Sequence, residues 1–390
     1  MKTVAVIGAG AAGCFCAANL RKMAPELSVT VFEAGSKPMA KLAITGGGRC
    51  NITNSFEGIK SLKEAYPRGE RVMKRALKEF SVQNTVDWFT EAGVPLKLQE
   101  DHCYFPVSQD AMDVVRCLER GMKGAELRLK SPVNDLKALL KEFDAVVVTT
   151  GGAPKGLPFL AGLDVETVPP VPSLFTFNIK DKSLTSLMGL VVEAGVSIPG
   201  SGFKAEGPLL ITDWGLSGPA VLKLSSYAAR FLNQNSYRAP LTINWLNRPE
   251  SEVRKELLAL GKDNPAKMVV STHILPSRLW EHIVLRAGLC KDIRWGEMGS
   301  KGLNKLVSTL VSDSYTIEGK SRFRDEFVTC GGVSLEAVEL GTLQSKQYPG
   351  LYFAGEVLDI DAITGGFNLQ AAWSTAYMVA KGLSCKLSAV

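Results

Sequence analysis

The sequence predicts an α/β protein in which both chain ends form one parallel-sheet domain, interrupted by an inserted β-barrel-like domain that carries a small helical domain. A β-branched run at 3–7 precedes a glycine-rich turn and a helical pattern, as in strands buried on both faces of a parallel sheet. Past about residue 190 the pattern changes to short alternating runs such as 241–245, typical of antiparallel sheet. A last buried run at 350–355, followed by a glycine-rich turn and a helix, returns the chain to the first sheet.

Periodicity predicts the remaining elements. Helical spacing of apolar residues covers 71–80 and 82–92 and resumes after Ser108. Short strands are expected at 126–129, 133–136 and 144–150, and helical periodicity returns inside the β-rich segment. The expected domain boundaries are 1–190 and 345–390 for the two parts of the first domain, 191–248 and 309–344 for the two parts of the β-barrel-like domain, and 249–308 for the helical insert.

The composition of the 390-residue chain is that of a globular protein, with 46% hydrophobic and 22% charged residues. Its formal net charge of +6 comes from a mild excess of cations, with no block of five or six like charges. We therefore expect a small-molecule substrate and no nucleic acid as partner. Nothing in the composition or the motifs indicates an oligomeric state.

No apolar run is long enough to span a membrane, so no membrane partner is expected. Lys2 and the apolar stretch up to Cys14 resemble a bacterial export signal, but cleavage there would remove the glycine-rich turn described below. A cytoplasmic protein is the expectation. The eight cysteines form no C-x-x-C pair and no pair with a histidine at metal-ligand spacing, so no metal site is expected.

The turn after the first strand, Gly8-Ala9-Gly10-Ala11-Ala12-Gly13, has the form G-x-G-x-x-G. The first glycine permits a tight turn, the second lets the backbone approach a pyrophosphate, and the third lets the helix pack closely on the strand. The helix that follows offers free N–H groups and a positive dipole end to phosphates. Alone the motif is weak, because glycine-rich turns also occur as purely structural bends.

Glu33 makes the motif specific. It ends the second expected strand, twenty residues after Gly13, where a carboxylate accepts hydrogen bonds from ribose hydroxyls. The strand, loop, helix, strand and acid together predict a Rossmann-like dinucleotide-binding domain. A carboxylate at this position repels a 2′-phosphate, which disfavours NADP as the ligand of the loop.

The return of the chain to the sheet at its end favours FAD over NAD. A nicotinamide dehydrogenase normally completes its cofactor domain in one stretch, whereas here Gly355-Glu356 and the helix entered at Gly366 come last. A second helix N-terminus suits a two-ended ligand, with the amides near Asn368 and Leu369 facing the N1–C2=O edge of a flavin. The alternative is a purely structural helix with a glycine-rich entry. No second G-x-G-x-x-G occurs, so NAD(P)H would be a transient electron donor docked over the flavin.

Three further segments carry a specific pattern: 46–54 (GGGRCNITN), 212–219 (TDWGLSGP), and 355–359 (GEVLD) with 365–370 (GGFNLQ). They resemble the BaiN-like (YhiN-type) flavoproteins, FAD- or NAD(P)-dependent oxidoreductases, and the resemblance spans essentially the whole chain. It implies a two-part FAD domain interrupted by a β-barrel-like domain with a helical insert, in agreement with the pattern above. It also implies FAD contacts at Glu33 (ribose), Lys41, Arg49 and Asn51 (pyrophosphate and flavin side), Val133 (backbone to adenine), Thr150, Gly151, Glu356, Asn368 and Leu369.

The motifs and the resemblance together predict eighteen cofactor-binding residues: Gly8, Gly10, Ala11, Ala12, Gly13, Glu33, Ala34, Lys41, Arg49, Asn51, Val133, Thr150, Gly151, Gly355, Glu356, Gly366, Asn368 and Leu369. Three positions depart from the family pattern, since Asp213 replaces a usual His, Phe367 a usual Tyr and Ala371 a usual Trp. Proton transfer by a histidine at 213 is therefore excluded, and the pocket beside the flavin can differ in shape.

The catalytic residues remain unassigned. Arg49 could lower the pKa of the neighbouring Cys50, but packing beside the cofactor is the favoured interpretation for that thiol. Arg49 itself is favoured as a fork for pyrophosphate or for a substrate carboxylate. His102 and Tyr104 are candidate proton donors in a loop, where a solvated role is favoured.

Residues of the inserted segment are weaker candidates. Ser217, before the helix expected at 220–227, could help its N-terminus bind an anionic substrate or could only cap it. Asp213 could line the same pocket. His273 and His282 fall in the helical insert, where structural roles are expected.

These observations predict an FAD-dependent oxidoreductase with its pocket where the FAD sheet meets the inserted domain. Its sharpest form, NAD(P)H-driven transfer of hydride from flavin N5 to an electron-poor, enone-like small molecule, rests on the resemblance. Two alternatives stay open: a flavin amine oxidase using dioxygen, and a non-catalytic flavin-bearing binding protein.

Overall fold

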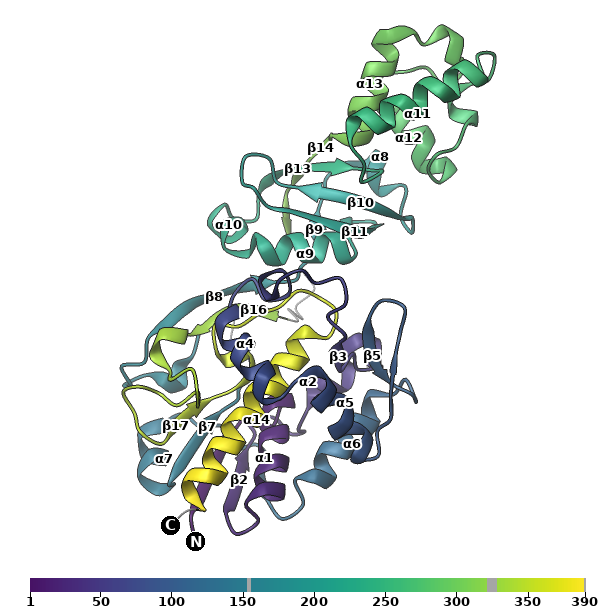
Figure 1. Ribbon diagram of the computed structural model, residues 1–390. Coiled ribbons are helices and arrows are strands. Elements are labelled where there is room, and N and C mark those ends of the chain that lie inside the picture. The colour runs from purple at the N-terminus through teal and green to yellow at the C-terminus, as the bar shows by residue number, and fades with distance from the viewer. Residues whose placement is uncertain (153–155, 321–327, 389–390) are drawn as a thin grey trace. The chain divides into compact units, whose positions relative to one another are not determined.

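The structure, a computed structural model, describes residues 1–152, 156–320 and 328–388 of the chain. They form two compact units, drawn in Figure 1. The first unit combines Met1–Pro172 with Val328–Val390, and the second, which we call the inserted unit, is Ser173–Phe327. Both chain ends therefore belong to one unit, as the sequence predicts.

A five-stranded parallel sheet lies at the centre of the first unit. Its order is β17-β7-β1-β2-β6, with β1 (Thr3–Ile7), β2 (Ser28–Phe32), β6 (Glu126–Arg128), β7 (Ala145–Val148) and β17 (Leu351–Phe353). All residues of β7 are buried, as expected for a strand covered on both faces. β17 pairs with β7 in parallel, with Leu351 opposite Val146. The end of the chain thus completes the sheet that its beginning starts.

Two helices that follow the first and last strands share one core. α1 (Ala11–Met23) and α14 (Phe367–Leu387) pack against each other, and Figure 1 shows the purple α1 beside the yellow α14. Phe15 of α1 contacts Trp373 of α14 with ring centroids 5.2 Å apart, and both side chains are fully buried. Within the described residues no helix, α14 included, has the length and apolar character needed to cross a membrane.

The other elements of the first unit surround this core. They are the helices α2 (Ala40–Ile44), α3 (Leu62–Ala65), α4 (Glu70–Glu79), α5 (Val82–Glu91), α6 (Ala111–Gly121) and α7 (Leu136–Glu142), the three-stranded sheet of β3 (Thr53–Asn54), β4 (Leu96–Leu98) and β5 (Cys103–Pro106), and the pair β8 (Thr167–Ser173) and β16 (Val328–Val333). The helices predicted over 71–80 and 82–92 are confirmed as α4 and α5. The strand predicted at 133–136 is wrong, because Asp135 caps α7 by accepting the Ala138 N–H at 3.1 Å.

A seven-stranded antiparallel sheet forms most of the inserted unit. Its order is β14-β13-β10-β11-β12-β9-β15, with β9 (Phe177–Asn178), β10 (Val191–Ser197), β11 (Lys204–Ile211), β12 (Gly215–Ser217), β13 (Ala239–Asn244), β14 (Asp313–Ile317) and β15 (Gly319–Lys320). Ile317 of one edge strand pairs with β13, whereas Gly319 of the other edge strand pairs with β9. Only Glu318 separates them in sequence, so the sheet must curl until its two edges nearly meet. This curl gives the β-barrel-like form that the sequence predicts.

Helices complete the inserted unit. α8 (Lys182–Thr185) and α10 (Ala229–Gln234) are short, and α9 (Pro219–Tyr227) packs on β10 and β11. α11 (Glu250–Asp263), α12 (Ser277–Arg286) and α13 (Gly299–Val311) form the helical insert, with Leu257, Ile283 and Leu306 buried in one apolar cluster. The helical periodicity expected after residue 249 is therefore confirmed.

The units divide at Pro172 and Val328, whereas the sequence analysis expected 190 and 345. Residues 173–190 belong to the inserted unit because β9 pairs with β12. Residues 328–344 belong to the first unit because β16 pairs with β8. Residues 321–327, in the expected second part of the β-barrel-like domain, lie outside the described residues.

Candidate functional site

The G-x-G-x-x-G turn joins β1 to α1, and each of its glycines meets a different requirement. Gly8 has φ +99°, and a β-carbon there would lie 2.7 Å from the Thr149 carbonyl oxygen. A β-carbon on Gly13 would lie 1.9 Å from the Gly8 carbonyl oxygen, so only glycine permits this packing of helix on strand. Gly10 faces open space, with no atom within 4 Å of where its β-carbon would be. The turn thus leaves room for a ligand at its second glycine.

The N-terminus of α1 lies at this open side. Gly10 caps the helix, and Cys14 is the residue whose N–H bonds back to the Gly10 carbonyl at 3.0 Å. The N–H groups of the first turn, at Ala11, Ala12 and Gly13, precede that bond and have no partner within the helix. Together with the helix dipole they make a site for a phosphate.

Glu33 lies directly beside the turn. Its Oε2 accepts the Ala9 N–H at 2.9 Å and its Oε1 accepts the Gly35 N–H at 2.6 Å, which fixes the carboxylate at the end of β2. The loop that leads to Val133 comes near too, since the Ser131 N–H donates to the Glu33 carbonyl at 2.8 Å. Glu33 and the loop that leads to Val133 therefore lie at one edge of the sheet, with Ala34 exposed next to Glu33.

Glu356 and the turn after β7 form the next part of the site. A β-carbon on Gly152 would lie 2.7 Å from Glu356 Oε1, and Gly151 has φ +75° in the same turn. Glu356 Oε1 also accepts the Thr329 N–H at 2.7 Å. Burial raises the pKa of the Glu356 carboxyl, and the charge of Lys41 opposes that rise. The structure thus brings Gly151, Glu356 and Lys41 close to one another.

The connection between β17 and α14 packs on the phosphate turn. A β-carbon on Gly355 would lie 2.8 Å from the β-carbon of Ala12, and Gly355 has φ +75°. The Gly355 N–H donates to Thr375 Oγ1 of α14 at 2.9 Å. This contact brings the last strand and the last helix to the first turn of α1.

The N-terminus of α14 is held by Asn51. The Asn51 amide nitrogen donates to the Thr53 carbonyl at 3.0 Å, and its oxygen accepts the Gly366 N–H at 3.3 Å. The Asn368 side chain is also engaged, because it accepts the Ala362 N–H at 2.9 Å and donates to the Ala362 carbonyl at 3.1 Å. Both side chains brace the loop into α14, and the backbone N–H groups of Asn368 and Leu369, in its first turn, have no partner within the helix.

Arg49 and Cys50 differ in their surroundings. The exposed Arg49 guanidinium lies 4.5 Å from the centroid of the Phe105 ring, and its Nε donates to the Gly46 carbonyl at 3.3 Å. Cys50 is fully buried with φ +61°, and burial raises the pKa of its thiol to about 12. A neutral thiol is a poor nucleophile, which favours the packing interpretation of Cys50.

The other sequence candidates lie on other elements. His102 Nδ1 lies 3.3 Å from Glu57 Oε2, with the His102 side chain half-buried and the Glu57 side chain exposed, which is consistent with a solvated loop. Ser217 ends β12 in the inserted unit, just before α9, and Asp213 is exposed in the turn before that strand. The described residues contain no group of three or more side chains suited to hold a metal ion.

Buried polar groups that the sequence analysis missed support the start of α14. The fully buried Gln370 accepts hydrogen bonds from Thr53 Oγ1 and from Thr85 Oγ1 at 2.9 Å, and Trp373 Nε1 donates to the Ile52 carbonyl at 3.0 Å. Arg68 forms an ion pair with the fully buried Asp361, in the loop before α14. Neither set has a local sequence signal, because the partners lie far apart in the chain.

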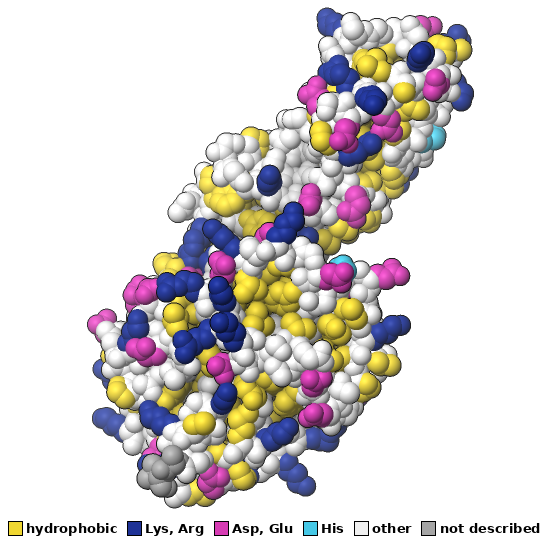
Figure 2. Space-filling view, in the orientation of Figure 1, with side chains coloured by type: hydrophobic (Ala, Val, Ile, Leu, Met, Phe, Trp, Pro, Cys, Tyr) yellow, Lys and Arg dark blue, Asp and Glu magenta, His cyan; other side chains and the backbone are white. Residues whose placement is uncertain are grey.

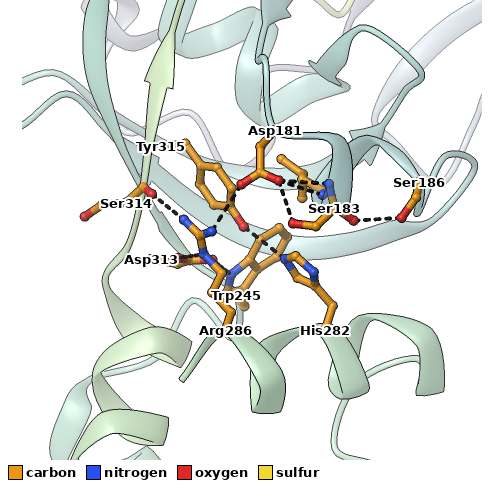
Figure 3. Close-up of polar contacts among 10 residues, drawn as sticks. Asp181, Ser183, Ser186, Trp245, His282, Arg286, Asp313, Ser314 and Tyr315 are labelled. Carbon is orange, nitrogen blue, oxygen red and sulfur yellow. Dashed lines mark hydrogen bonds and ion pairs between the residues drawn. The ribbon is translucent and has the colours of Figure 1, made fainter. Parts of the chain in front are cut away.

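A second polar cluster lies in the inserted unit, where α12 meets the sheet (Figure 3). Arg286 donates from Nε to Asp313 at 2.6 Å and from a terminal nitrogen to Asp181 at 3.1 Å, and its guanidinium lies 4.2 Å from the Tyr315 ring centroid. His282 Nε2 lies 3.3 Å from the Tyr315 hydroxyl, and burial lowers the pKa of this histidine. These contacts tie the helical insert to the sheet.

Comparison with known proteins agrees with this geometry. The family model described as "HI0933-like protein Rossmann domain" matches residues 2–382. The chain is 30% identical to a ribosomal RNA dihydrouridine synthase of Haemophilus influenzae, over 97% of this chain and 98% of that one. It is 26% identical to the 3-dehydro-bile acid delta(4,6)-reductase of Clostridium scindens, over 98% of each chain.

Among solved structures, the 3-ketosteroid delta1-dehydrogenase from Sterolibacterium denitrificans, in complex with 1,4-androstadiene-3,17-dione, shares the fold. The match has a TM-score of 0.51 and 12% sequence identity, and covers 99% of this chain and 100% of that chain. The family match confirms the resemblance noted in the sequence, and two reductase or synthase relatives align over nearly the whole length. The chain therefore belongs to the HI0933-like Rossmann family and is an enzyme of the flavoprotein oxidoreductase class.

Proposed function

We propose that the flavin is FAD and that it binds along the carboxyl edge of the parallel sheet in the first unit. The contact of Gly355 with Ala12 carries this proposal, because it brings the end of β17, and through Thr375 the helix α14, to the first turn of α1. Two helix N-termini suit a ligand with a pyrophosphate at one place and a second electron-rich group at another. The open space at Gly10 fits the pyrophosphate, and Glu33 fits the adenosine ribose.

The remaining residues have roles that follow from their positions. The N–H groups of Asn368 and Leu369 would stabilise negative charge on the N1–C2=O edge of the flavin. Thr150, Gly151 and the backbone of Val133 would contact the rest of the cofactor. Asn51 would act indirectly, by holding the loop into α14.

We propose further that the reaction is the reduction of a carbon–carbon double bond conjugated to a carbonyl, with NAD(P)H as electron donor. When bound, the flavin supplies hydride transfer at N5. Two relatives support this acceptor class. A dihydrouridine synthase saturates the C5=C6 bond of uracil, which is conjugated to the C4 carbonyl. A 3-dehydro-bile acid delta(4,6)-reductase acts on a 3-oxo compound.

Anaerobic mixing tests the reaction. The flavin-loaded protein is mixed with NADH and with NADPH, and the flavin absorbance is followed with and without 2-cyclohexen-1-one as a small conjugated acceptor. Rapid bleaching by one nicotinamide, with recovery of colour on adding the enone, supports the proposal. Bleaching only by an added amine, with recovery by dioxygen, would favour an amine oxidase, and bleaching only by dithionite would favour a non-catalytic flavin protein.

A further inference from the structure

Helix α4 carries four cations on one exposed face. Arg71, Lys74, Arg75 and Lys78 are all exposed and follow the spacing i, i+3, i+4 and i+7, which places them along one side of a helix. The opposite side, with Val72, Met73 and Ala76, is buried in the first unit. Figure 2 shows dark-blue side chains gathered where Figure 1 draws α4.

These charges are not neutralised within the molecule. Among the residues that the structure describes, no carboxylate lies within 4.0 Å of the cationic nitrogens of Arg71, Lys74, Arg75 or Lys78. Glu79 at the end of the helix pairs with Lys381 at 2.9 Å instead. Like charges at i and i+4 destabilise a helix by a few tenths of a kcal/mol each. Repulsion within the row of cations therefore destabilises α4, and a bound anion would reduce that repulsion.

The cationic face begins beside the proposed flavin site. Gly69 caps α4, and a β-carbon there would lie 2.6 Å from the Ile360 side chain. The preceding residue, Arg68, pairs with Asp361. Ile360 and Asp361 belong to the loop that enters α14, whose first turn is proposed to meet the flavin. The row of cations thus extends from that loop along α4.

We propose that this face of α4 binds the phosphate backbone of an RNA substrate and presents one of its uracils to the flavin. The inference rests on the proposed function, because the double bond that the flavin reduces would belong to a uracil of the bound RNA. A helix that lies on a membrane needs exposed apolar residues beside its cations, whereas the apolar residues of α4 are buried in the core. A row of cations along a helix is the electrostatic footprint of nucleic acid binding.

The test is RNA affinity as a function of salt, measured with an unmodified transcript of a ribosomal RNA domain. The variant Arg71→Gln, Lys74→Gln, Lys78→Gln removes three charges from α4 and keeps Arg75, whose guanidinium packs near Gly341. The matched control, Lys255→Gln, Lys262→Gln, Lys301→Gln, removes three exposed charges from the helical insert. Flavin absorbance and thermal unfolding of each protein show that it is folded.

The α4 variant should bind the RNA at least tenfold more weakly than the parent at 0.15 M salt, and the slope of log affinity against log salt should fall by roughly 2, at about 0.7 per lost phosphate contact. The control variant should match the parent. Equal binding by the parent and the folded α4 variant would overturn the assignment, as would binding of the parent to phosphatidylglycerol vesicles but not to RNA.

Reduction of 2-cyclohexen-1-one separates this inference from the proposed function. The α4 variant should reduce the enone at the parental rate, because the face contacts RNA and not the flavin. If the parent binds RNA through α4 but reduces neither the enone nor uridine, the docking face is supported and the proposed reaction is contradicted. If the parent reduces the enone but shows no RNA affinity at 0.05 M salt, only the proposed docking face is contradicted.

Discussion

Gly355 packs so closely on Ala12 that a β-carbon at position 355 would lie 2.8 Å from the β-carbon of Ala12. This contact joins the last strand to the first helix, and the backbone of Gly355, at φ +75°, is one that other residues rarely adopt. Both properties depend on glycine, so the position offers a direct test of how the two chain ends form one site.

Gly355→Ala should lower the free energy of unfolding by about 1–3 kcal/mol, through backbone strain and the clash with Ala12, and should weaken flavin binding. Thermal unfolding and the flavin absorbance of the purified protein measure both effects. Gly382→Ala, in the interior of α14 with no atom within 4 Å of the new β-carbon, is the matched control and should stabilise slightly. A Gly355→Ala protein as stable and as yellow as the parent would contradict this account.

Glu33→Gln should weaken FAD binding roughly 10- to 150-fold, since a hydrogen bond to a charged group contributes about 1.5–3 kcal/mol. Glu33→Ala should yield mainly colourless apoprotein, because the Ala9 and Gly35 N–H groups also lose their acceptor. FAD titration of the apoproteins measures the affinity. Glu91→Gln, at a side chain that is 71% exposed, is the control and should bind FAD normally. Parental affinity in both Glu33 variants would remove Glu33 from the site.

Cys50→Ala should retain the flavin and most of the turnover, because the buried thiol with its raised pKa is not a thiolate at neutral pH. Maleimide labelling gives a second measurement. The exposed Cys290 and Cys385 should react with the native protein, and Cys50 only after unfolding. Loss of turnover with the flavin still bound would instead assign chemistry to Cys50.

The inserted unit should lose stability in mild acid through His282. Burial holds the pKa of His282 below its ordinary value of 6.5, so the unfolded chain binds this proton more readily than the folded chain. The stabilisation is therefore complete above about pH 6.5 and declines as the pH falls through the lowered pKa. The charges facing His282 are Asp313, Arg286 and Asp181, and the hydrogen bonds from Ser183 and Leu184 help to hold the pKa of Asp181 below its ordinary value.

Hydrogen-exchange protection of α12, corrected for the intrinsic exchange rate, measures this effect between pH 5 and pH 8. Protection should fall toward pH 5 in the parent and fall less in His282→Gln. His273→Gln, at an exposed histidine of the same insert, should behave as the parent does. Protection that is equally independent of pH in the parent and in His282→Gln would show that the histidine does not couple to folding.

The phosphate turn was predictable because its information is local. Strand, glycines, helix and acid follow one another within 33 residues, and each glycine is explained by the atoms next to it. The roles of Asn51 and Asn368 were not predictable in the same way. Their side chains hydrogen-bond to the backbone of the protein and brace the loop before α14. The bonded groups come together only in the folded chain.

One error of the sequence analysis also has a physical cause. The apolar residues near Val133 suggested a strand, but Asp135 begins a helix by capping it. The sequence contains no contiguous block of like charges, but α4 gathers on one face cations that are three and four residues apart. That spacing in α4 now gives reason to test an RNA partner, which the charge pattern along the sequence did not favour.

The five-stranded sheet has a consequence for biosynthesis. β17 leaves the ribosome only after the whole inserted unit, so the edge of nascent β7 that later pairs with β17 stays open until then. Pairing between such distant segments is slow and exposes an edge that favours aggregation. Emergence of β17 and α14, and not emergence of the glycine turn, should therefore set when the cofactor can be captured.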